Sequence, residues 1–306
     1  MADSRHPPTI DPVASARWLA RPATASAWLH EEVARRMVER LDIIRLQPQA
    51  WLHWAPVRGG LQAHQALRER YPRATPWLWH PNAAEAAQAT AQLQSPWWQL
   101  ERWRAPALHE GLPPDAGVQM VWANMALHHS ADPQAWLQQW HRALAVDGFL
   151  MFSCLGPDTL RELRQVYAAQ GWGEPAQAYT DMHDWGDMLV QAGFAEPVMD
   201  MERLTLTYAS PERLLQELRE LGRNLHVQRV GQQTGLRGRG WHAQLLQALL
   251  GLARPDQQGR LTLTFELVYG HALKPRPRAK VHAESAIAVD DLRQMLQAGR
   301  SAQRKV

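Results

Sequence analysis

Hydrophobic and polar residues follow two different periods along this chain. Between residues 27 and 45 an apolar side chain recurs at every fourth position, which is the spacing of an amphipathic helix. The apolar positions are Leu29, Val33, Met37 and Leu41. The segment LTLTFELVYGHAL at 261–273 has period two instead and predicts a strand.

Two continuous apolar runs predict strands that are buried on both faces of a parallel sheet. They are VQMVWANMA at 118–126 and FLMFSCL at 149–155. Between them, DPQAWLQQWHRAL predicts a helix, with Asp132 as the N-cap and Pro133 at the first helical position. A strand, a helix and a second strand follow one another here, which is the order of a parallel βαβ unit.

The rest of the chain repeats this alternation. Further strands are predicted at 51–54, 77–79 and 197–208, and further helices at 61–70, 158–169 and 183–192. A helix that begins at Ser210-Pro211 and ends at Gly222 leads into an arginine-rich loop and another helix near 240–253, which together form an insertion. The pattern therefore predicts an α/β fold with a doubly wound, mostly parallel sheet.

Charge and composition narrow the function. The 306 residues carry a net charge of only +3, which weighs against nucleic-acid binding. Basic residues gather in two places, which we interpret as a solvated loop and a tail; they are Arg223, Arg229, Arg237 and Arg239, then Lys274, Arg276, Arg278 and Lys280. The 15 tryptophans are unusual, and a cluster of them is able to fill a pocket that a smaller polar group has left.

Cysteine and histidine usage predicts neither a disulfide nor a metal site. Cys154 is the one cysteine, which favours a reducing compartment, and the histidines show no HxxxH spacing. The N-terminus lacks the apolar region of a secretory signal, and no run of about 18 apolar residues occurs to span a membrane. We therefore expect a cytoplasmic protein without a metal and without a membrane partner.

A family resemblance begins at VWANMALHHSADPQAWLQQWHRALAVDGFLMFSCLGPDTLRELR and continues through TDMHDWGDMLVQAGFAEPVMDMERLTLTY, SPERLLQELRELGRN and LTFELVYGHAL. It covers most of residues 12–274. The chain resembles the class I S-adenosylmethionine-dependent methyltransferases, specifically the BioC-like malonyl-carrier-protein O-methyltransferases of biotin synthesis. The resemblance implies a seven-stranded Rossmann-like sheet whose last strand is antiparallel, with a helical lid inserted before that strand.

This resemblance also implies a division of the chain. We expect a disordered N-terminus at 1–12, a methyltransferase-like core at 13–208 and a lid at 209–260. The final strand of the core would follow at 261–274, and a basic, disordered tail at 275–306.

The stretch WLHWAPVRGG departs from the family where a strand, an aspartate and a G-x-G-x-G loop are expected. His53 takes the position of the aspartate, Ala55 and Val57 replace two glycines, and only Gly59 or Gly60 is retained. A carboxylate binds the ribose hydroxyls of the cofactor well, whereas a histidine offers a single acceptor, and added Cβ atoms hinder the approach of the backbone.

Two more acid positions of the family are replaced. The second strand ends in Trp79-His80-Pro81, and Gln119 stands before the fourth strand. Trp18 falls where family members place an aromatic ring over the cofactor. The cofactor-binding candidates for S-adenosylmethionine are therefore His53, Gly59, Gly60, His80 and Trp18.

Ligands of doubly wound sheets bind outside the carboxyl ends of the strands. The resemblance places the methyl acceptor at the end of the fourth strand, so the catalytic candidates are Asn124, His128 and His129. A plain strand-to-loop junction explains the two histidines equally well. An arginine of the lid would hold the malonyl carboxylate or dock an acidic acyl carrier protein; the candidates are Arg219, Arg223 and Arg237.

Three hypotheses follow, of which nucleic-acid binding through Arg223 to Arg239 and the tail is disfavoured by the modest net charge. The other two concern the resemblance. In the first, the chain is a methyltransferase that binds S-adenosylmethionine through a remodelled loop and methylates a malonyl group on a carrier protein. In the second, it is a catalytically inactive pseudo-methyltransferase in which tryptophans fill the cofactor cleft. The fold and lid would then serve as a protein-binding or assembly module.

Overall fold

The computed structural model describes residues 10–93, 106–227 and 238–277. The chain divides into one unit over Met1–Pro275 and a second over Arg276–Val306, and the fold belongs to the first. The segment 1–12, expected to be disordered, contributes its last residues to this fold, because Ile10 forms a β-bridge with His226. The expected tail lies outside the described residues from position 278 onward.

The described strands form a sheet of eight in which seven lie along one path, in the order β3-β2-β1-β4-β5-β8-β6. Neighbours from β3 to β5 are parallel, and β8 runs antiparallel to both β5 and β6. The short β7 pairs with β8 and adds the eighth strand. The strands are β1 (Ala50–Trp54), β2 (Thr75–Trp79), β3 (His109–Glu110), β4 (Val118–Ala123), β5 (Leu144–Leu155), β6 (Ala195–Tyr208), β7 (Ala253–Arg254) and β8 (Arg260–Leu273).

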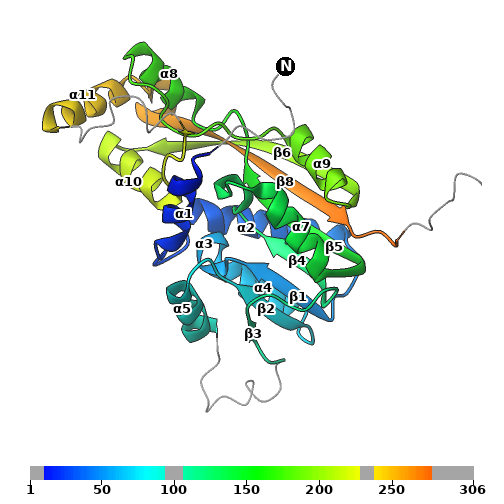
Figure 1. Cartoon of the computed structure of the whole chain (residues 1–306). Coiled ribbons are helices and arrows are strands. Elements are labelled where there is room, and N and C mark those ends of the chain that lie inside the picture. Colours follow the sequence, from blue (N-terminus) through cyan, green and yellow to red (C-terminus); the bar gives the residue numbers. More distant parts are fainter. Residues whose placement is uncertain (1–9, 94–105, 228–237, 278–306) are drawn as a thin grey trace, which may run out of the picture. The chain divides into compact units, whose positions relative to one another are not determined.

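Helices cover both faces of this sheet, so the predicted doubly wound α/β class is confirmed. Figure 1 shows α7 and α9 on one face and α2 on the other. The described α-helices are α1 (Pro12–Ala20), α2 (Trp28–Glu39), α3 (Pro56–Gly59), α4 (Leu61–Arg70), α5 (Ala83–Leu93), α7 (Pro133–Ala143), α8 (Arg161–Ala169), α9 (Met182–Gln191), α10 (Pro211–Leu221) and α11 (Arg239–Leu250).

Alternate residues of each central strand enter different hydrophobic layers, because successive side chains of a strand point to opposite faces. In β1, Trp51 belongs to the hydrophobic layer that includes residues of α2 and α4, whereas Leu52 belongs to the layer that includes residues of α7 and α9. In β4 the same division separates Trp122 from Val121. Both faces of the central strands are therefore core, as their continuous apolar runs predict.

The helix between the two long apolar runs begins as its sequence predicts. The Asp132 side chain accepts a hydrogen bond from the backbone N–H of Ala135, and Pro133 occupies the first helical turn. The helix predicted at 27–45 is shorter in the structure, because α2 ends at Glu39 and a 3₁₀ turn, Arg40–Ile43, follows it.

The segment between β6 and β8 contains α10, α11 and β7, in the part of the chain for which the resemblance implies a lid. Figure 1 shows α10 and α11 beside the ends of β6 and β8. Ser210 caps α10 by accepting a hydrogen bond from the Arg213 N–H, as a serine before a proline-led helix should. Within the described ranges, no helix combines the length and apolar character needed to cross a membrane.

Candidate functional site

The turn after β1 is a short helix, where a cofactor-binding sheet of this kind would carry a glycine loop. Ala55 adopts a left-handed conformation with φ of 50°, and Pro56 then starts the single turn α3. Proline favours the first position of a helix because its φ is already helical and its missing N–H is not needed there. The sequence A-P-V-R-G therefore forms a compact helical turn whose N–H groups bond back to Ala55 and Pro56.

The two glycines of this turn lie against protein atoms. A Cβ on Gly59 would stand 2.7 Å from the backbone oxygen of Asn124, so this glycine permits close packing of the α3 turn on β4. Gly60 has φ of 122°, and a Cβ there would meet a carboxylate oxygen of Glu31 at 3.0 Å. Neither glycine presents an open backbone surface to a ligand.

Asn124 fastens the α3 turn to the end of β4. Its Nδ2 donates to the backbone oxygens of Gly59 and, at 2.8 Å, of His30. Its Oδ1 accepts a 2.6 Å hydrogen bond from the Ser153 hydroxyl. Both polar atoms of the side-chain amide of this predicted catalytic residue are therefore hydrogen-bonded within the protein. Their role is to hold the α3 turn at the carboxyl end of β4.

An ion pair closes the space between the α3 turn and the N-terminal segment. Arg58 Nη2 lies 2.7 Å from Glu85 Oε1; the Glu85 side chain is fully buried and the Arg58 side chain 11% exposed. Arg58 Nη2 also donates to the backbone oxygens of Trp18, Leu19 and Arg21. We call this arrangement the Arg58–Glu85 joint.

Glu85 has two further donors, and they complete the joint. The Ala23 N–H donates to Glu85 Oε1 at 2.9 Å, and Asn82 Nδ2 donates to the same oxygen at 3.1 Å. The charged pair is thus surrounded by hydrogen bonds, which is the condition for burying two charges at tolerable cost. Only Nη1 of Arg58 lacks a hydrogen-bond partner among the described residues of the joint, which ties together three segments far apart in the sequence.

His53, predicted to contact the cofactor, lies inside the core. Its Nδ1 is 3.4 Å from Nδ1 of His64, and the two rings stack. Burial, together with the neighbouring His64 and His80, lowers the pKa of His53 well below its usual range. Burial likewise lowers the pKa of His64 to about 3. Both rings are neutral at physiological pH.

His80 follows β2, at the position where the resemblance implies an acid. Its two ring nitrogens are buried and have no hydrogen-bond partner among the described residues. Burial lowers its pKa, so the ring offers one donor and one acceptor and carries no charge near neutral pH. His80 is therefore a neutral, buried polar side chain whose ring nitrogens have no partner among the described residues.

Indole rings occupy the carboxyl ends of β1 and β2. Trp54 and Trp79 stack with their ring centroids 3.7 Å apart. Trp140 meets Trp54 edge-on, and Trp136 packs against both members of the stack. Such stacked and edge-on geometries are the favourable ones for aromatic pairs. This tryptophan cluster fills the space beside the α3 turn on the α7 face.

Two features that the resemblance implies for S-adenosylmethionine binding are absent from the conformation of the residues described here. A ribose diol calls for a charged acceptor at the ends of β1 and β2, where His53 is buried and Trp79 is stacked. A methionine moiety calls for open backbone at the turn, where Gly59 packs directly on Asn124. His80 is polar, but its ring nitrogens are buried.

His128 and His129 lie together at the end of β4, in the 3₁₀ turn Leu127–His129. Their ring centroids are 4.1 Å apart, and both side chains are buried. Burial, together with the nearby His129, lowers the pKa of His128 well below its usual range. Burial and the nearby His30 lower the pKa of His129 to about 3. The pair is therefore neutral and suited to hydrogen bonding.

His30 joins this group, although the sequence does not single it out. Burial lowers its pKa to about 4, and its Nδ1 lies 2.8 Å from the Arg58 backbone oxygen. The helix position of His30 resembles an ordinary core position, so only the tertiary structure reveals its place. Among the described side chains, no group of three His, Cys, Asp or Glu residues is arranged to hold a metal ion.

Trp18 lies between two arginines and the histidines. The guanidinium of Arg58 is 4.9 Å from its ring centre and that of Arg223 is 5.6 Å away. The ring centroid of His129 is 5.7 Å from that of Trp18, and the hydroxyl of Ser15 donates to the backbone oxygen of His129 at 2.7 Å. Helix α1 therefore covers the end of β4.

A cationic pocket opens beside α1. It has a volume of about 1000 Å³ and is lined by α1 and the segment after α10, including Arg17, Arg21 and Arg223. Burial and the like charges of Arg21 and Arg219 lower the pKa of Arg223, and no ion pair neutralises Arg223 within the described part of the chain. We call this the arginine pocket.

The three predicted lid arginines have different positions. Arg223 donates through Nη1 to the backbone oxygens of Gly222, at 2.7 Å, and Arg219. Arg219 is exposed in the last turn of α10. Arg237 lies outside the described residues, as do Trp97 and Trp98 of the tryptophan-rich segment.

The sequence analysis did not identify Arg58 and Glu85, which form the buried ion pair beside the α3 turn. Glu85 lies in the first turn of α5, where an acidic residue is ordinary. Its partner is 27 positions away, and no local pattern links the two. The adjacency of Arg58 to Gly59 in the remodelled turn is the only signal that the sequence contains.

Comparisons with known proteins agree with this fold and identify its relatives. The chain is 43% identical over 260 residues to the malonyl-(acyl-carrier protein) O-methyltransferase of Gallionella capsiferriformans, covering 83% of this chain and 87% of that protein. It is 42% identical over 266 residues to the protein of the same name from Laribacter hongkongensis, covering 84% and 86%. No family model matches the chain.

Solved structures show the same fold at low sequence identity. The YcgJ protein of Bacillus subtilis superposes with a TM-score of 0.52 at 11% identity, covering 80% of this chain and 99% of that one. A putative methyltransferase from Bacillus halodurans gives 0.50 at 15% identity, with the same coverage. With relatives above 40% identity along most of its length, the chain belongs to the malonyl-(acyl-carrier protein) O-methyltransferase family.

Proposed function

We propose that this protein recognises a malonyl-loaded acyl carrier protein and methylates the free carboxylate of the malonyl group. The observation that carries the proposal is 43% identity over 87% of a relative with that name. The resemblance adds biotin synthesis as the setting and S-adenosylmethionine as the methyl donor. With that donor, the bond between the sulfonium sulfur and the methyl carbon would break as a carboxylate oxygen forms its bond to the methyl carbon. The sulfur would keep the electron pair and leave as the thioether of S-adenosylhomocysteine, so the sulfonium and carboxylate charges would be lost together.

The acceptor side of the site suits this reaction. A carboxylate is already a nucleophile, so the protein needs to orient it and exclude water rather than remove a proton. His128 and His129 are neutral and buried, and their rings offer hydrogen bonds without a competing charge. We assign them the orientation of the malonyl group, and we assign Asn124 the positioning of the edge that they share.

The arginine pocket supplies the counterpart for an acidic carrier protein. Arg17, Arg21 and Arg223 surround it, and its acid, Asp11, is engaged in capping α1. Gathered like charges repel one another in the free protein, and an anionic partner relieves that repulsion. Binding there would place the carrier next to Trp18 and His129.

A second candidate function is carrier-protein binding without methyl transfer. The closed edge favours it, because the Arg58–Glu85 joint and the tryptophan cluster take the place of the groups that a methyl donor needs. The acceptor side and the arginine pocket would serve such a binding module unchanged.

One experiment separates these functions. Binding of purified malonyl-acyl carrier protein is measured by calorimetry, and methyl ester formation with S-adenosylmethionine by mass spectrometry of the carrier. Binding with ester formation supports the main proposal, and binding without it supports the second candidate. Absence of binding overturns both.

The matched variants are Arg223→Ala and Arg35→Ala. Arg35 is an exposed arginine of α2 that pairs with Glu32 and Glu39, away from the pocket. We expect Arg223→Ala to weaken carrier binding about tenfold and to reduce its salt dependence, as loss of a steering charge does. Equal effects of the two variants would refute the role of the arginine pocket.

A further inference from the structure

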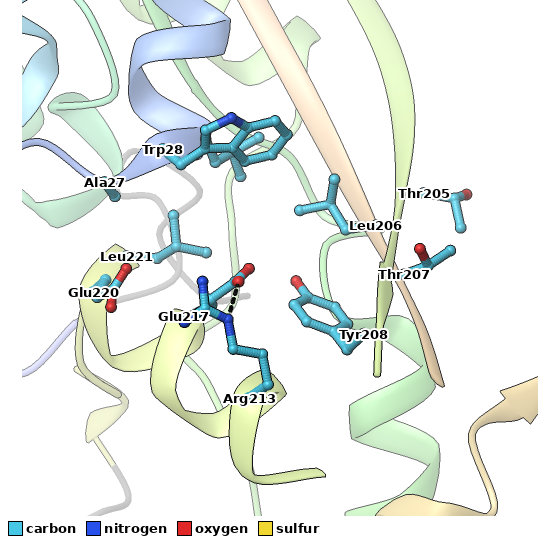
Figure 2. A pocket seen from close by; sticks show the side chains of 11 residues that line it. Ala27, Trp28, Thr205, Leu206, Thr207, Tyr208, Arg213, Glu217, Glu220 and Leu221 are labelled. Atoms are coloured by element: carbon cyan, nitrogen blue, oxygen red, sulfur yellow. Dashed lines mark hydrogen bonds and ion pairs between the residues drawn. The ribbon is translucent and has the colours of Figure 1, made fainter. Parts of the chain in front are cut away.

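A second pocket lies between the core and the helix that follows β6. Its volume is about 510 Å³, and Figure 2 shows side chains from three elements around it. The start of α2, the end of β6 and one side of α10 line it. The lining residues are Ala27, Trp28, Leu29, Thr205, Leu206, Thr207, Tyr208, Arg213, Glu217, Glu220 and Leu221.

One polar atom in the wall of this pocket lacks a partner. The Tyr208 side chain is 2% exposed, and its hydroxyl has no hydrogen bond within the described residues. Figure 2 shows the hydroxyl directed toward the space between Trp28 and α10. A buried hydroxyl without a partner is costly, so it calls for an explanation, and a bound acceptor is one.

The nearby carboxylate of Glu217 is committed elsewhere. Glu217 Oε1 accepts a 2.8 Å hydrogen bond from Arg213 Nε, an ion pair that Figure 2 marks. Burial, together with the nearby Glu217, raises the pKa of Tyr208, so the hydroxyl keeps its proton and acts as a donor. The pocket therefore offers one hydrogen-bond donor that awaits an acceptor.

The walls and rim define the ligand further. Trp28, Leu206 and Leu221 supply apolar surface, and Trp28 is 61% exposed, an unusual position for so large an apolar side chain. Glu217 and Glu220 stand on the rim, and the arginine there is already paired. An anion is disfavoured, and a neutral chain that carries carbonyl acceptors is favoured.

The pocket lies next to the candidate site. Leu221 lines the pocket, and the following Gly222 packs against His129: a Cβ on this glycine would stand 3.0 Å from the Nε2 atom of that histidine. Leu29 lines the pocket from α2, and His30 follows it within the histidine group. Arg223 of the arginine pocket is two residues beyond Leu221. The two pockets thus flank the end of α10.

We propose that this pocket binds the pantetheine arm of the carrier protein, with the Tyr208 hydroxyl donating to one of its amide carbonyls. The inference rests on the proposed function, because it assumes a carrier protein as the partner. In this proposal each pocket binds a different part of the loaded carrier. The neutral arm binds between Trp28 and α10, and the acidic carrier protein binds at the arginine pocket.

The test uses Tyr208→Phe, with pantetheine and malonyl-pantetheine as probes in calorimetric titrations. Removal of the hydroxyl should weaken binding of both probes about fivefold, the loss of one neutral hydrogen bond. The melting temperature of the free protein should stay unchanged or rise, because the variant removes an unpaired buried group. If the tyrosine had only a structural role, the variant would not weaken probe binding while the melting temperature stayed unchanged or rose.

Tyr269→Phe is the matched control. The Tyr269 hydroxyl donates a 2.5 Å hydrogen bond to Glu202, so this variant loses an existing bond. Its melting temperature should fall, and its affinity for the probes should equal that of the wild type. If Tyr208→Phe behaves like this control, or if the wild type binds neither probe at millimolar concentration, the proposal is overturned.

The same variants distinguish a failure of the pantetheine proposal from a failure of the proposed function. Methylation or binding of malonyl-acyl carrier protein that is insensitive to Tyr208→Phe would refute the pocket and leave the function standing. Binding of pantetheine that depends on Tyr208, without any binding of the loaded carrier, would support the pocket and refute the function.

Discussion

Replacement of Glu85 by glutamine tests the Arg58–Glu85 joint directly. The two side chains have nearly the same shape, so the variant removes the charge and leaves the packing of α5 intact. Glutamine can still accept the hydrogen bond from the Ala23 N–H. Arg58 would then remain as a buried cation without its counterion.

The size of the effect follows from burial. The Glu85 side chain is fully buried and that of Arg58 is 11% exposed, so water screens the pair little. Breaking a buried pair by removing one partner costs about 3–5 kcal/mol. Because Arg58 keeps its three backbone acceptors, we expect the lower end, a loss of about 3 kcal/mol in the free energy of unfolding.

The assay is equilibrium unfolding in urea, followed by tryptophan fluorescence. Glu39→Gln is the control, since Glu39 pairs with Arg35 on the surface and the two side chains are 63% and 56% exposed. Exposed pairs of this kind are screened by water and contribute little to stability. A cost for Glu85→Gln no larger than that of the control would show that water reaches the joint and would refute the reasoning.

Three further changes probe the same edge. Asn124→Ala should lower the free energy of unfolding by about 2 kcal/mol, because two backbone oxygens lose a buried donor; urea unfolding checks this. Gly59→Ala should lower it by about 1–3 kcal/mol without any ligand, since the Cβ meets the Asn124 backbone oxygen at 2.7 Å, and a stability equal to wild type would contradict the packing role. His64 stays neutral in the fold down to about pH 3, whereas an unfolded histidine binds a proton near pH 6.5, so stability falls as the pH drops below 6.5. Between pH 7 and pH 5 this histidine alone should account for about 2 kcal/mol of the loss, and His64→Asn should remove that part when unfolding is compared at the two pH values.

Local pattern predicts most of the fold. The apolar runs at 118–126 and 149–155 correspond to β4 and β5, and the Asp132 cap starts α7 as its sequence requires. These features depend on residues that are close together along the chain, where periodicity and capping act. The antiparallel final strand came from the family resemblance, because period two alone does not give a strand its direction.

The site is harder to predict, because its bonds connect distant residues. Asn124 at the end of β4 reaches the α3 turn 65 positions earlier, and Ser26 donates to the backbone oxygen of Val57. The sequence shows that the glycine loop is altered and that a cluster of tryptophans is present that is able to fill the cofactor cleft. It does not show that Arg58 turns toward Glu85, since the burial of a charge depends on a partner that only the tertiary structure supplies.

The Trp54–Trp79 pair also provides a natural optical reporter. Two nearly parallel indoles whose centres are 3.7 Å apart couple electronically and should give a strong, paired signal in circular dichroism. Any molecule that enters between the ends of β1 and β2 has to separate these rings, and the paired signal would then collapse. The circular dichroism signal of this pair can therefore be used, without a label, to follow the separation of the two rings in a stopped-flow experiment.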